Sequence, residues 1–421
     1  MRSPAALATL GDVHQVSGPV EHLHVRRHNL SLILRLLATQ GPRSRAGLAA
    51  VTGLTRATVS SLVAELIERR LVDDAGPEAD QRVGRPATLV RLDGAHVVTV
   101  GIEVDVGLIS VLVADLSGRE IARRRHPIGE QSTAFDSVVD VISLEARLAI
   151  ADAEAAGRRV AGLSVAVPGI VDAQSGVVRR APNLDWTDVP LGRRLEAAVG
   201  AQIPVACDNE ANLAAVAEHR LGRFAGARHL VYVFAMSGVG SGVIVDGALL
   251  RGASGFAGEV GHMTVEPGGV PCACGSRGCW ETTIGMRALL ASTVPDLAPA
   301  LLGDRRLAPE QRIAPVTERA ASGDPTALAG LSRFGEWLGV GLANIVDAYN
   351  PEVIVLGGFL PLLAEWIEDA ARRSLADHAL SGALAACQLE FSSLGLSAGA
   401  VGGTILAAAH VFDDPTVVPG R

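Results

Sequence analysis

The feature that most restricts the fold of this chain is an alternation of apolar, β-branched segments with helical segments, which begins at residue 97. The apolar segments are "VVTVGIEVDVGLISVLVADLSG", "RVAGLSVAVPGIVD", "HLVYVFAMSGVGSGVIVDG" and "PEVIVLGG". Such alternation is typical of an α/β architecture. Because the region from 94 onward is longer than one sheet usually organises, we expect two lobes, 94–206 and 207–421, with a cleft between them. In this division, the final helix of the chain can pack on the first lobe although it follows the second in the sequence.

The first ninety residues follow a different, purely helical pattern. One apolar face carries Leu30, Ile33, Leu34 and Leu37 and stops before Gly41-Pro42. A short helix should follow Ser44 as its N-cap, with Leu48 and Val51 apolar. A third should follow Thr55 as its N-cap, with an apolar face formed by Val59, Leu62, Val63, Leu66 and Ile67. This order predicts a helix-turn-helix unit over 28–93, preceded by a flexible tail over 1–27. A small three-helix bundle without a DNA role is the alternative.

The third helix is the expected recognition helix of this unit. Its polar first turns are free to enter a major groove, and they comprise Thr55, Arg56, Thr58, Ser60 and Ser61. The following segment, "QRVGRPATLVRLD", places Arg82, Gly84 and Arg85 before a β-prone run. An extended Gly-Arg-Pro segment can lie in a narrow minor groove, so we interpret it as a wing. An ordinary charged linker has the same composition.

Charge and composition bear on compartment and partners. The first 93 residues hold 12 Arg and 9 acidic residues, whereas the whole chain has a net charge of −8, so only the first part is suited to a polyanion. No apolar run reaches the length of about 18 residues that a membrane helix needs, and the N-terminus lacks a secretory pattern. We therefore expect a cytoplasmic protein with no membrane partner, whose cysteines are reduced.

Three of the five cysteines fall within eight positions, in "CACGSRGC". Cys272, Cys274 and Cys279, together with His262, form a Cys3His set of the kind that closes a tetrahedral Zn²⁺ site. With no vacant protein position, such a zinc would be structural. A redox role for the Cys-x-Cys pair is the competing interpretation. We expect Cys207 and Cys387 to be core thiols.

Polar groups that suit a sugar lie at the ends of the predicted elements. They are Asn183, Asn209, Glu210, Glu259, His262 and Glu281. Carboxylates and amides give paired hydrogen bonds to vicinal hydroxyls, although each residue taken singly is more often a cap or a solvated loop residue. The glycine-rich segment around Gly238, Gly240 and Gly242, with Ser237 and Ser241, can direct N–H groups at a phosphate. A tight hairpin of small residues is the alternative.

These motifs resemble the ROK family (repressors, open reading frames and sugar kinases) from about residue 28 to 411. The resemblance rests on "GEVGHM" followed by "CACGSRGCWE", and on "VPGIVD", "APNLDW", "DNEAN", "SGVGSG" and "NPEVIVLGG". It implies an actin-like ATPase (ribonuclease H-like) fold of two lobes, with zinc in the second lobe. It also implies a sugar in the cleft, contacted by Asn183, Asn209, Glu259, His262 and Glu281, with Gly169 lining the pocket. An N-terminal winged helix is what the family's repressors add.

Two departures from the family pattern concern catalysis. The kinases open their first strand turn with Asp-x-Gly-Gly-Thr-Lys, whereas this chain has Glu103, Val104, Asp105, Val106, Gly107 and Leu108. The extra carboxylate of Asp105 would oppose a γ-phosphate with no cation to offset it. The family's catalytic base matches Glu210, whose added methylene displaces the carboxylate. The base position is thus vestigial, but this change does not by itself exclude activity. The altered first strand turn is the heavier argument, and from it we expect no enzyme activity.

The resemblance leads us to expect a regulator, in particular a repressor of sugar-utilisation genes. Its operator affinity would respond to a sugar or sugar phosphate in the cleft, and a homodimer or a dimer of dimers would suit a two-fold related operator. The first alternative is an ATP-dependent hexose kinase with a DNA-binding appendage, supported by "SGVGSG" and "VIVLGG". In the second alternative, a protein partner controls release from DNA.

Overall fold

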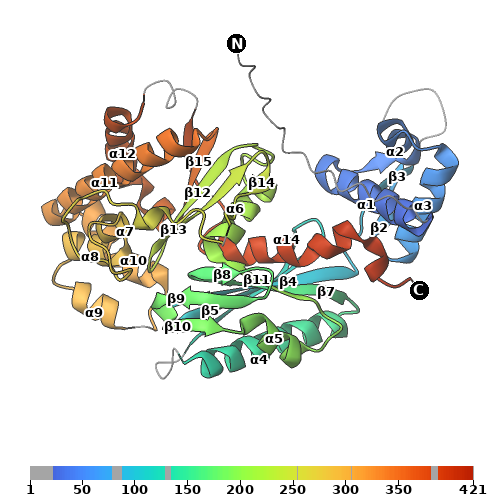
Figure 1. Ribbon diagram of the computed structural model, residues 1–421, viewed down its shortest axis with the longest axis horizontal. Helices are drawn as coiled ribbons and strands as arrows, with labels where there is room; N and C mark the ends of the chain where they lie inside the picture. Colours follow the sequence, from blue (N-terminus) through green and yellow to red (C-terminus); the bar gives the residue numbers. More distant parts are fainter. Residues whose placement is uncertain are drawn as a thin grey trace, which may run out of the picture.

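The structure is a computed structural model that describes residues 22–77, 88–128, 134–253, 255–304, 306–380 and 387–420. It consists of a small N-terminal unit and a body of two lobes, with the C-terminal helix α14 (Ala398–Asp413) running from the body to the N-terminal unit (Figure 1). Within these ranges no single helix is both long and apolar enough to cross a membrane. Two helices, Arg45–Thr52 and Arg56–Glu68, meet the length and hydropathy criteria only when taken together, and a bend of 117° separates them.

The N-terminal unit is a winged helix-turn-helix. Its elements are α1 (His22–Gln40), β1 (Arg43–Ser44), α2 (Arg45–Thr52), α3 (Arg56–Glu68), β2 (Val72–Pro77) and β3 (Thr88–Leu92). Both expected N-caps are present, because the Ser44 hydroxyl accepts from the Gly47 N–H and the Thr55 hydroxyl accepts from the Thr58 N–H. Gly53 ends α2 in the left-handed conformation, at φ +72°.

The apolar faces of this unit pack as the periodicity predicts, with one exception. Leu30, Ile33, Leu34 and Leu37 are buried, whereas Val51 is exposed, because it lies on the side of α2 away from the core. Helix α1 starts at His22, so the predicted tail over 1–27 extends too far; no proline or glycine lies between His22 and residue 28 to stop the helix.

The first lobe is built on a five-stranded sheet with the order β11-β7-β4-β5-β6. Its strands are β4 (Val97–Asp105), β5 (Leu108–Asp115), β6 (Glu120–Pro127), β7 (Arg159–Val167) and β11 (Val205–Asn209), and helices α4 (Phe135–Ala155) and α5 (Leu191–Val199) cover one face. A small sheet of β8 (Ile170–Asp172), β9 (Val177–Ala181) and β10 (Trp186–Val189) extends this lobe, and η1 (Pro182–Leu184) joins β9 to β10. The expected lobe boundary after residue 206 falls inside β11, which pairs in parallel with β7 up to Asn209.

The second lobe repeats the topology of the first. Its sheet has the order β14-β13-β12-β15-β16, formed by β12 (Leu230–Ala235), β13 (Val239–Val245), β14 (Ala248–Leu249), β15 (Val353–Gly358) and β16 (Gln388–Phe391). In both sheets three antiparallel strands are followed by two parallel ones. The chain therefore has an α/β fold of two lobes with the same strand order.

Helices fill the rest of the second lobe. They are α6 (Glu210–Leu221), η2 (Val260–His262), α7 (Glu281–Ile284), α8 (Met286–Thr293), α9 (Ala298–Gly303), α10 (Pro309–Ala321), α11 (Pro325–Tyr349), η3 (Leu360–Leu363) and α12 (Ala364–His378). After α14, η4 (Pro415–Val417) follows beside the N-terminal unit. Helices α6 and α14 pack closely on each other between the two sheets. A Cβ at Gly402 of α14 would lie 1.8 Å from the Leu213 carbonyl oxygen of α6, so only glycine permits this approach.

Helix α14 also connects the body with the N-terminal unit. It packs on β4 and β7, while its last residues and η4 contact α1. The Ser31 hydroxyl donates to the Phe412 carbonyl at 2.6 Å, and Arg27 pairs with Asp414 at 3.2 Å. One hydrophobic cluster joins Leu30 and Leu66 of the N-terminal unit to Val411 and Val418. The two parts therefore share a core.

Candidate functional site

The ends of several elements bring the predicted polar residues together between the lobes. Asn209 lies where β11 ends and α6 begins, and its side-chain oxygen caps α6 by accepting from the Ala211 and Asn212 N–H groups. Its amide nitrogen donates to the Gly169 carbonyl at 2.8 Å and to Glu210 at 2.9 Å. The Asn209 side chain is therefore fixed by four contacts.

Gly169 allows the chain to pass close to its neighbours at this point. It has φ +95°, and a Cβ there would lie 2.2 Å from the Arg180 carbonyl oxygen. A side chain would displace the β8–β9 segment that leads to Asn183.

The turn between β12 and β13 forms the opposite wall of the site. The glycine-rich segment is a tight hairpin, in which Ala235 faces Val239 and the Met236 N–H donates to the Gly238 carbonyl at 2.9 Å. Asn183 donates to the Ser237 hydroxyl at 3.3 Å. The Ser241 hydroxyl is buried and donates to the Gly258 carbonyl, so it is not free to hold a phosphate.

Glu281 is held against this hairpin. Its carboxylate accepts from the Val239 N–H at 3.1 Å, and a Cβ at Gly238 would lie 2.7 Å from the Glu281 oxygen. Glu281 Oε1 also lies 3.8 Å from the Cys272 sulfur, and Glu259 lies 3.9 Å from the His262 ring. The predicted sugar residues and the predicted metal ligands are thus adjacent.

Three carboxyl groups in and beside the site have raised pKa values. Burial raises the pKa of Glu210 well above its usual range, and the nearby Glu103, Glu259 and Asp105 raise it further. Burial likewise raises the pKa of Glu259, which His262 partly offsets, and it raises the pKa of Glu103 to about 8. Since the charges of Glu103, Glu259 and Asp105 all raise the pKa of Glu210, these groups form one cluster of interacting acids.

Several residues of this region were not predicted from the sequence. Asp208 is fully buried, accepts from the Asn209 N–H at 2.8 Å and pairs with Arg251 at 2.6 Å. The pair ties the segment after β14 to the start of α6. Arg125 of β6 pairs with Glu310 of α10 at 2.7 Å and so joins the two lobes. Only the position of Asp208 at a strand end gave a signal in the sequence.

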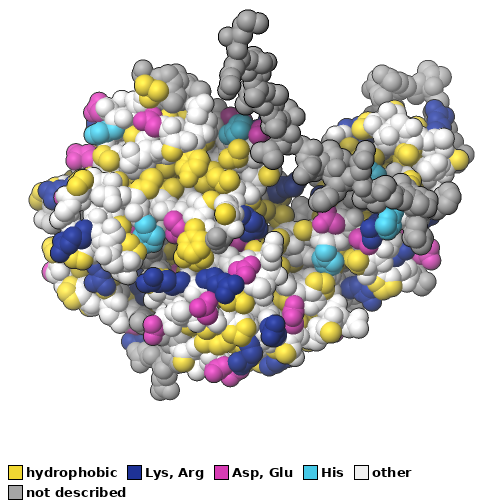
Figure 2. All heavy atoms as spheres, viewed as in Figure 1, with side chains coloured by type: hydrophobic (Ala, Val, Ile, Leu, Met, Phe, Trp, Pro, Cys, Tyr) yellow, Lys and Arg dark blue, Asp and Glu magenta, His cyan; other side chains and the backbone are white. Residues whose placement is uncertain are grey.

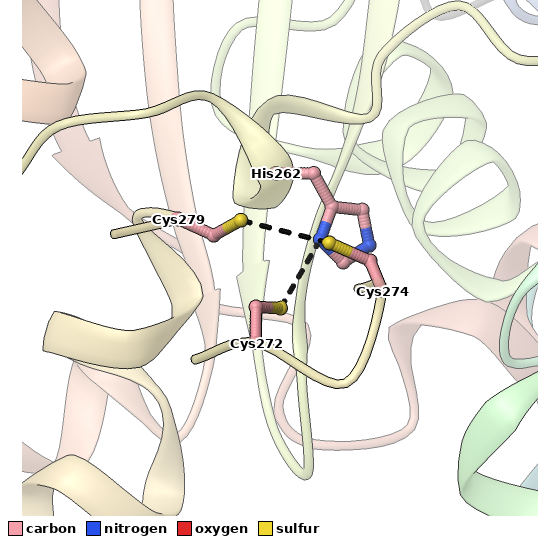
Figure 3. Close-up of side chains that lie close together, drawn as sticks. All are labelled: His262, Cys272, Cys274 and Cys279. Atoms are coloured by element: carbon pink, nitrogen blue, oxygen red, sulfur yellow. Dashed lines mark hydrogen bonds between the residues drawn. The ribbon is translucent and has the colours of Figure 1, made fainter. Parts of the chain in front are cut away.

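The four predicted metal ligands converge in space (Figure 3). One ligand atom from each of His262, Cys272, Cys274 and Cys279 lies within 4.8 Å of the others. The Cys272 sulfur is 3.7 Å from His262 Nδ1, and the Cys274 and Cys279 sulfurs are 3.6 Å apart. The Ser276 backbone N–H lowers the pKa of the Cys274 thiol, whereas burial raises that of Cys272. Three thiols and an imidazole in this arrangement are a donor set that suits Zn²⁺.

The two remaining cysteines lie away from this cluster. Cys207 is a buried core thiol, and burial raises its pKa to about 12. Cys387, which was also expected in the core, is only partly buried, because it lies at the start of β16, the edge strand of the second sheet.

The predicted DNA-facing residues of α3 are mostly on the surface. Arg56, Ser60 and Ser61 are exposed, whereas the hydroxyls of Thr55 and Thr58 contact each other at 2.9 Å as part of the N-cap. Arg82, Gly84 and Arg85 lie outside the described residues. The strands on either side, β2 and β3, pair antiparallel with Val72 opposite Leu92, which is the hairpin that a wing requires.

The fold defines the class of protein to which this chain belongs. It is a class with a two-lobed α/β body, in which both lobes share one topology, joined to a winged helix-turn-helix unit. Residues 99–410 match the ROK family and residues 31–83 match the MarR family. A putative xylose repressor from Caldicellulosiruptor sp. (strain Rt8B.4) is 32% identical over 84% of this chain and 88% of its own length. The xylose repressor of Bacillus subtilis (strain 168) is 30% identical over 92% and 97%, respectively. The chain belongs to the ROK family.

Solved structures agree with this assignment. A ROK family transcriptional regulator, described as a homolog of the Escherichia coli Mlc protein, superposes with a TM-score of 0.77 at 24% identity, covering 94% of this chain and 100% of that one. A ROK family glucokinase from Streptomyces griseus, solved with glucose and AMPPNP, has a TM-score of 0.63 at 31% identity and covers 74% and 99%. The actin-like two-lobed fold and the added N-terminal unit are therefore as expected.

Proposed function

We propose that the chain is a sugar-responsive transcriptional repressor that binds operator DNA through its N-terminal unit. The observation that carries this proposal is the shared core between a winged helix-turn-helix and a two-lobed body, in which α14 reaches both the interlobe site and α1. A change in lobe position can thus reach the DNA-binding unit through packed contacts. The names of the two repressors above support the same function.

The sugar site in this proposal comprises Gly169, Asn183, Asn209, Glu210, Glu259, His262 and Glu281. Fixed amides and carboxyl groups hold hydroxyls in one orientation. Burial raises the pKa of Glu210 and so favours its protonated form, which can donate as well as accept a hydrogen bond. Xylose is the first sugar to test, because the relatives carry that name. Glucose and the sugar phosphates are the next candidates.

We assign a structural Zn²⁺ to His262, Cys272, Cys274 and Cys279. When bound, the ion would neutralise the thiolates and hold the segment around them in a single conformation. His262 is three residues from Glu259, and Cys279 is two residues from Glu281. The ligand segment therefore fixes the spacing of two carboxyl groups of the sugar site.

The same region argues against phosphoryl transfer. The carboxyl group of Glu103, on β4, reaches the first turn of α14 and accepts from the Ala400 N–H at 3.0 Å. A carboxyl group therefore lies at a helix N-terminus that could otherwise receive a phosphate. Asp105 is half-buried and accepts a hydrogen bond from Ser237 of the opposite lobe. We therefore propose a binding protein rather than a kinase.

An ATP-dependent sugar kinase is the second candidate, since the Streptomyces griseus glucokinase shares the fold at 31% identity.

The operator would be contacted by the N-terminal unit. The contacting residues would be Arg56, Ser60 and Ser61 of α3, the turn at Thr55 and Thr58, and the predicted wing residues Arg82, Gly84 and Arg85. We propose a homodimer on a two-fold related operator as the binding form. A protein partner that releases DNA is a further possibility for the test to reveal.

The test is fluorescence anisotropy on DNA from upstream of the chain's own gene, at fixed salt, titrated with xylose, glucose and their phosphates. We expect sequence-dependent binding that one sugar alters. Glu259→Gln should abolish the sugar effect and leave DNA affinity intact, while Glu266→Gln, at an exposed position nearby, is the matched control. ATP-dependent phosphorylation of any of these sugars would instead favour the kinase. DNA binding that no sugar changes would contradict the proposal.

A further inference from the structure

A cavity of about 520 Å³ lies between the N-terminal unit and the body. We call it the interdomain cavity. Helix α1 forms one wall, with Ala38 and Thr39, and α14 forms another, with Ile405, Ala408 and Phe412. The turn after β5 and the end of α6 close the remaining sides. None of the residues assigned to sugar or zinc lines it, and its volume is that of a small-molecule site.

Most of the cavity wall is apolar, and part of it stays exposed among the residues that the structure describes. Leu221, at the end of α6, is a large apolar side chain that stays 39% exposed beside the cavity. Leu116, Ile405 and Phe412 add further apolar surface. An exposed apolar wall at the junction of two domains favours a ligand with an apolar body.

The charged groups of the lining determine the sign of the ligand. The carboxylate of Asp115 already has its partners, because it accepts hydrogen bonds from Ser117 and Arg119 and pairs with the Arg119 guanidinium at 3.1 Å. Arg35 pairs with Asp413. Arg220 is exposed, and no ion pair or hydrogen bond to it is found among the described residues. Among the described residues of the lining, the charge at the rim that has no ion-pair partner is therefore the positive charge of Arg220.

We propose that the interdomain cavity binds a small organic anion with an apolar body, such as a medium-chain carboxylate, at a site separate from the sugar cleft. The carboxylate would face Arg220, and the hydrocarbon would lie against Leu221, Ile405 and Phe412.

Such a ligand touches both sides of the joint that carries the DNA-binding unit. The contacts between Ser31 and Phe412 and between Arg35 and Asp413 lie at the same α1–α14 junction (Figure 1). A ligand held between α1 and α14 therefore favours one position of the N-terminal unit over others and changes DNA affinity. This second effect rests on the proposed function, whereas the binding itself does not.

The test uses 8-anilinonaphthalene-1-sulfonate, which combines an aromatic body with one negative charge, as a fluorescent probe on the full chain. We expect saturable binding of one probe per chain and displacement by decanoate but not by decanol. Ala409→Trp and Ala38→Trp fill the cavity from opposite walls, and each should weaken probe binding at least tenfold. Arg220→Gln should weaken it about fivefold, the effect of one exposed charge.

The matched controls lie on the exposed face of α4, away from the cavity. Ala151→Trp and Arg147→Gln change the same residue types there and should leave probe binding unchanged. Thermal unfolding checks that each variant is folded.

Unchanged affinity in both filling variants, or displacement of the probe by a saturating sugar, would overturn the proposal. If the probe binds as expected but decanoate leaves DNA affinity unchanged, the proposed effect of the ligand on DNA binding is wrong. The proposed binding site in the interdomain cavity is then still supported. If the chain binds no DNA at all, the proposed function fails independently of the cavity.

Discussion

The carboxyl group of Glu103, on the first strand of the body, accepts a hydrogen bond from the backbone N–H of Ala400, in the first turn of α14, at 3.0 Å. Gly399 makes this possible, because a Cβ there would lie 2.9 Å from the Glu103 carboxyl carbon. The contact joins the interlobe site to the helix that reaches the DNA-binding unit.

Replacing Glu103 with Gln should stabilise the protein at neutral and alkaline pH. The pKa of Glu103 is raised from 4.5 to about 8 by burial, so between these values the folded chain holds a proton that the unfolded chain has released. The stability contributed by Glu103 therefore falls as pH rises through this window and is constant above pH 8. Glutamine cannot ionise and still accepts from Ala400. We expect a gain of roughly 1 to 3 kcal/mol at pH 8.

This gain should shrink to near zero at pH 4.5, as measured by denaturant unfolding across the pH range. Glu154→Gln, on the exposed surface of α4, is the control. A gain that is the same at pH 4.5 and pH 8 would show that folding does not raise the pKa of Glu103.

Replacing Cys274 with Ser should remove the metal. The sulfur is one of four converging ligand atoms, and a site with three ligands binds zinc much more weakly. Elemental analysis of the purified protein should give about one zinc per chain for the wild type and little for the variant, with a lower unfolding temperature. Cys387→Ser, away from the cluster, should keep its zinc. A wild type without metal but with a full sugar response would refute the structural role.

Replacing Arg56 with Ala should weaken operator binding about tenfold, since a recognition-helix arginine contributes on the order of 1 to 3 kcal/mol. Arg56 is exposed in the first turn of α3. Sugar affinity, measured by calorimetry, should not change. Arg147→Ala on α4 serves as the control for loss of one surface charge. If both variants bind DNA like the wild type, α3 is not the reading helix.

Reversing Arg125 to Glu should shift the two lobes apart. Arg125 pairs with Glu310 across the interlobe gap at 2.7 Å, with both side chains a little over one-third exposed. An exposed pair contributes up to about 1 kcal/mol, so sugar affinity should fall by up to about fivefold. Adding Glu310→Arg should restore it. Arg124→Glu breaks a pair with Asp152 within the first lobe and should leave affinity unchanged. If the double variant does not recover sugar affinity, the ion pair between Arg125 and Glu310 does not control the closure of the lobes.

Local signals in the sequence predicted the local structure well. The N-caps at Ser44 and Thr55 depend only on a hydroxyl beside the first helical turn, and both are present. The four predicted metal ligands cluster because glycines permit tight turns over a few residues. The start of α1 was placed too late, since end positions depend on weak differences in propensity rather than on periodicity.

Contacts between distant segments could not be predicted in the same way. The pairs Asp208 with Arg251 and Arg125 with Glu310 join residues that no sequence spacing relates. The strand pairing of β11 with β7 likewise moved the lobe boundary beyond residue 206.

The sequence by itself determined the helix-turn-helix, the α/β alternation, the Cys3His set and the polar residues of the site, because each depends on periodicity or on residues close along the chain. The tertiary structure alone decided which acids share one buried cluster, how α14 joins the cleft to the DNA-binding unit, and where the interdomain cavity lies. The pKa of Glu103 illustrates the reason. Its value follows from burial and from neighbours on other elements, and these exist only once the sheets and α14 have packed together.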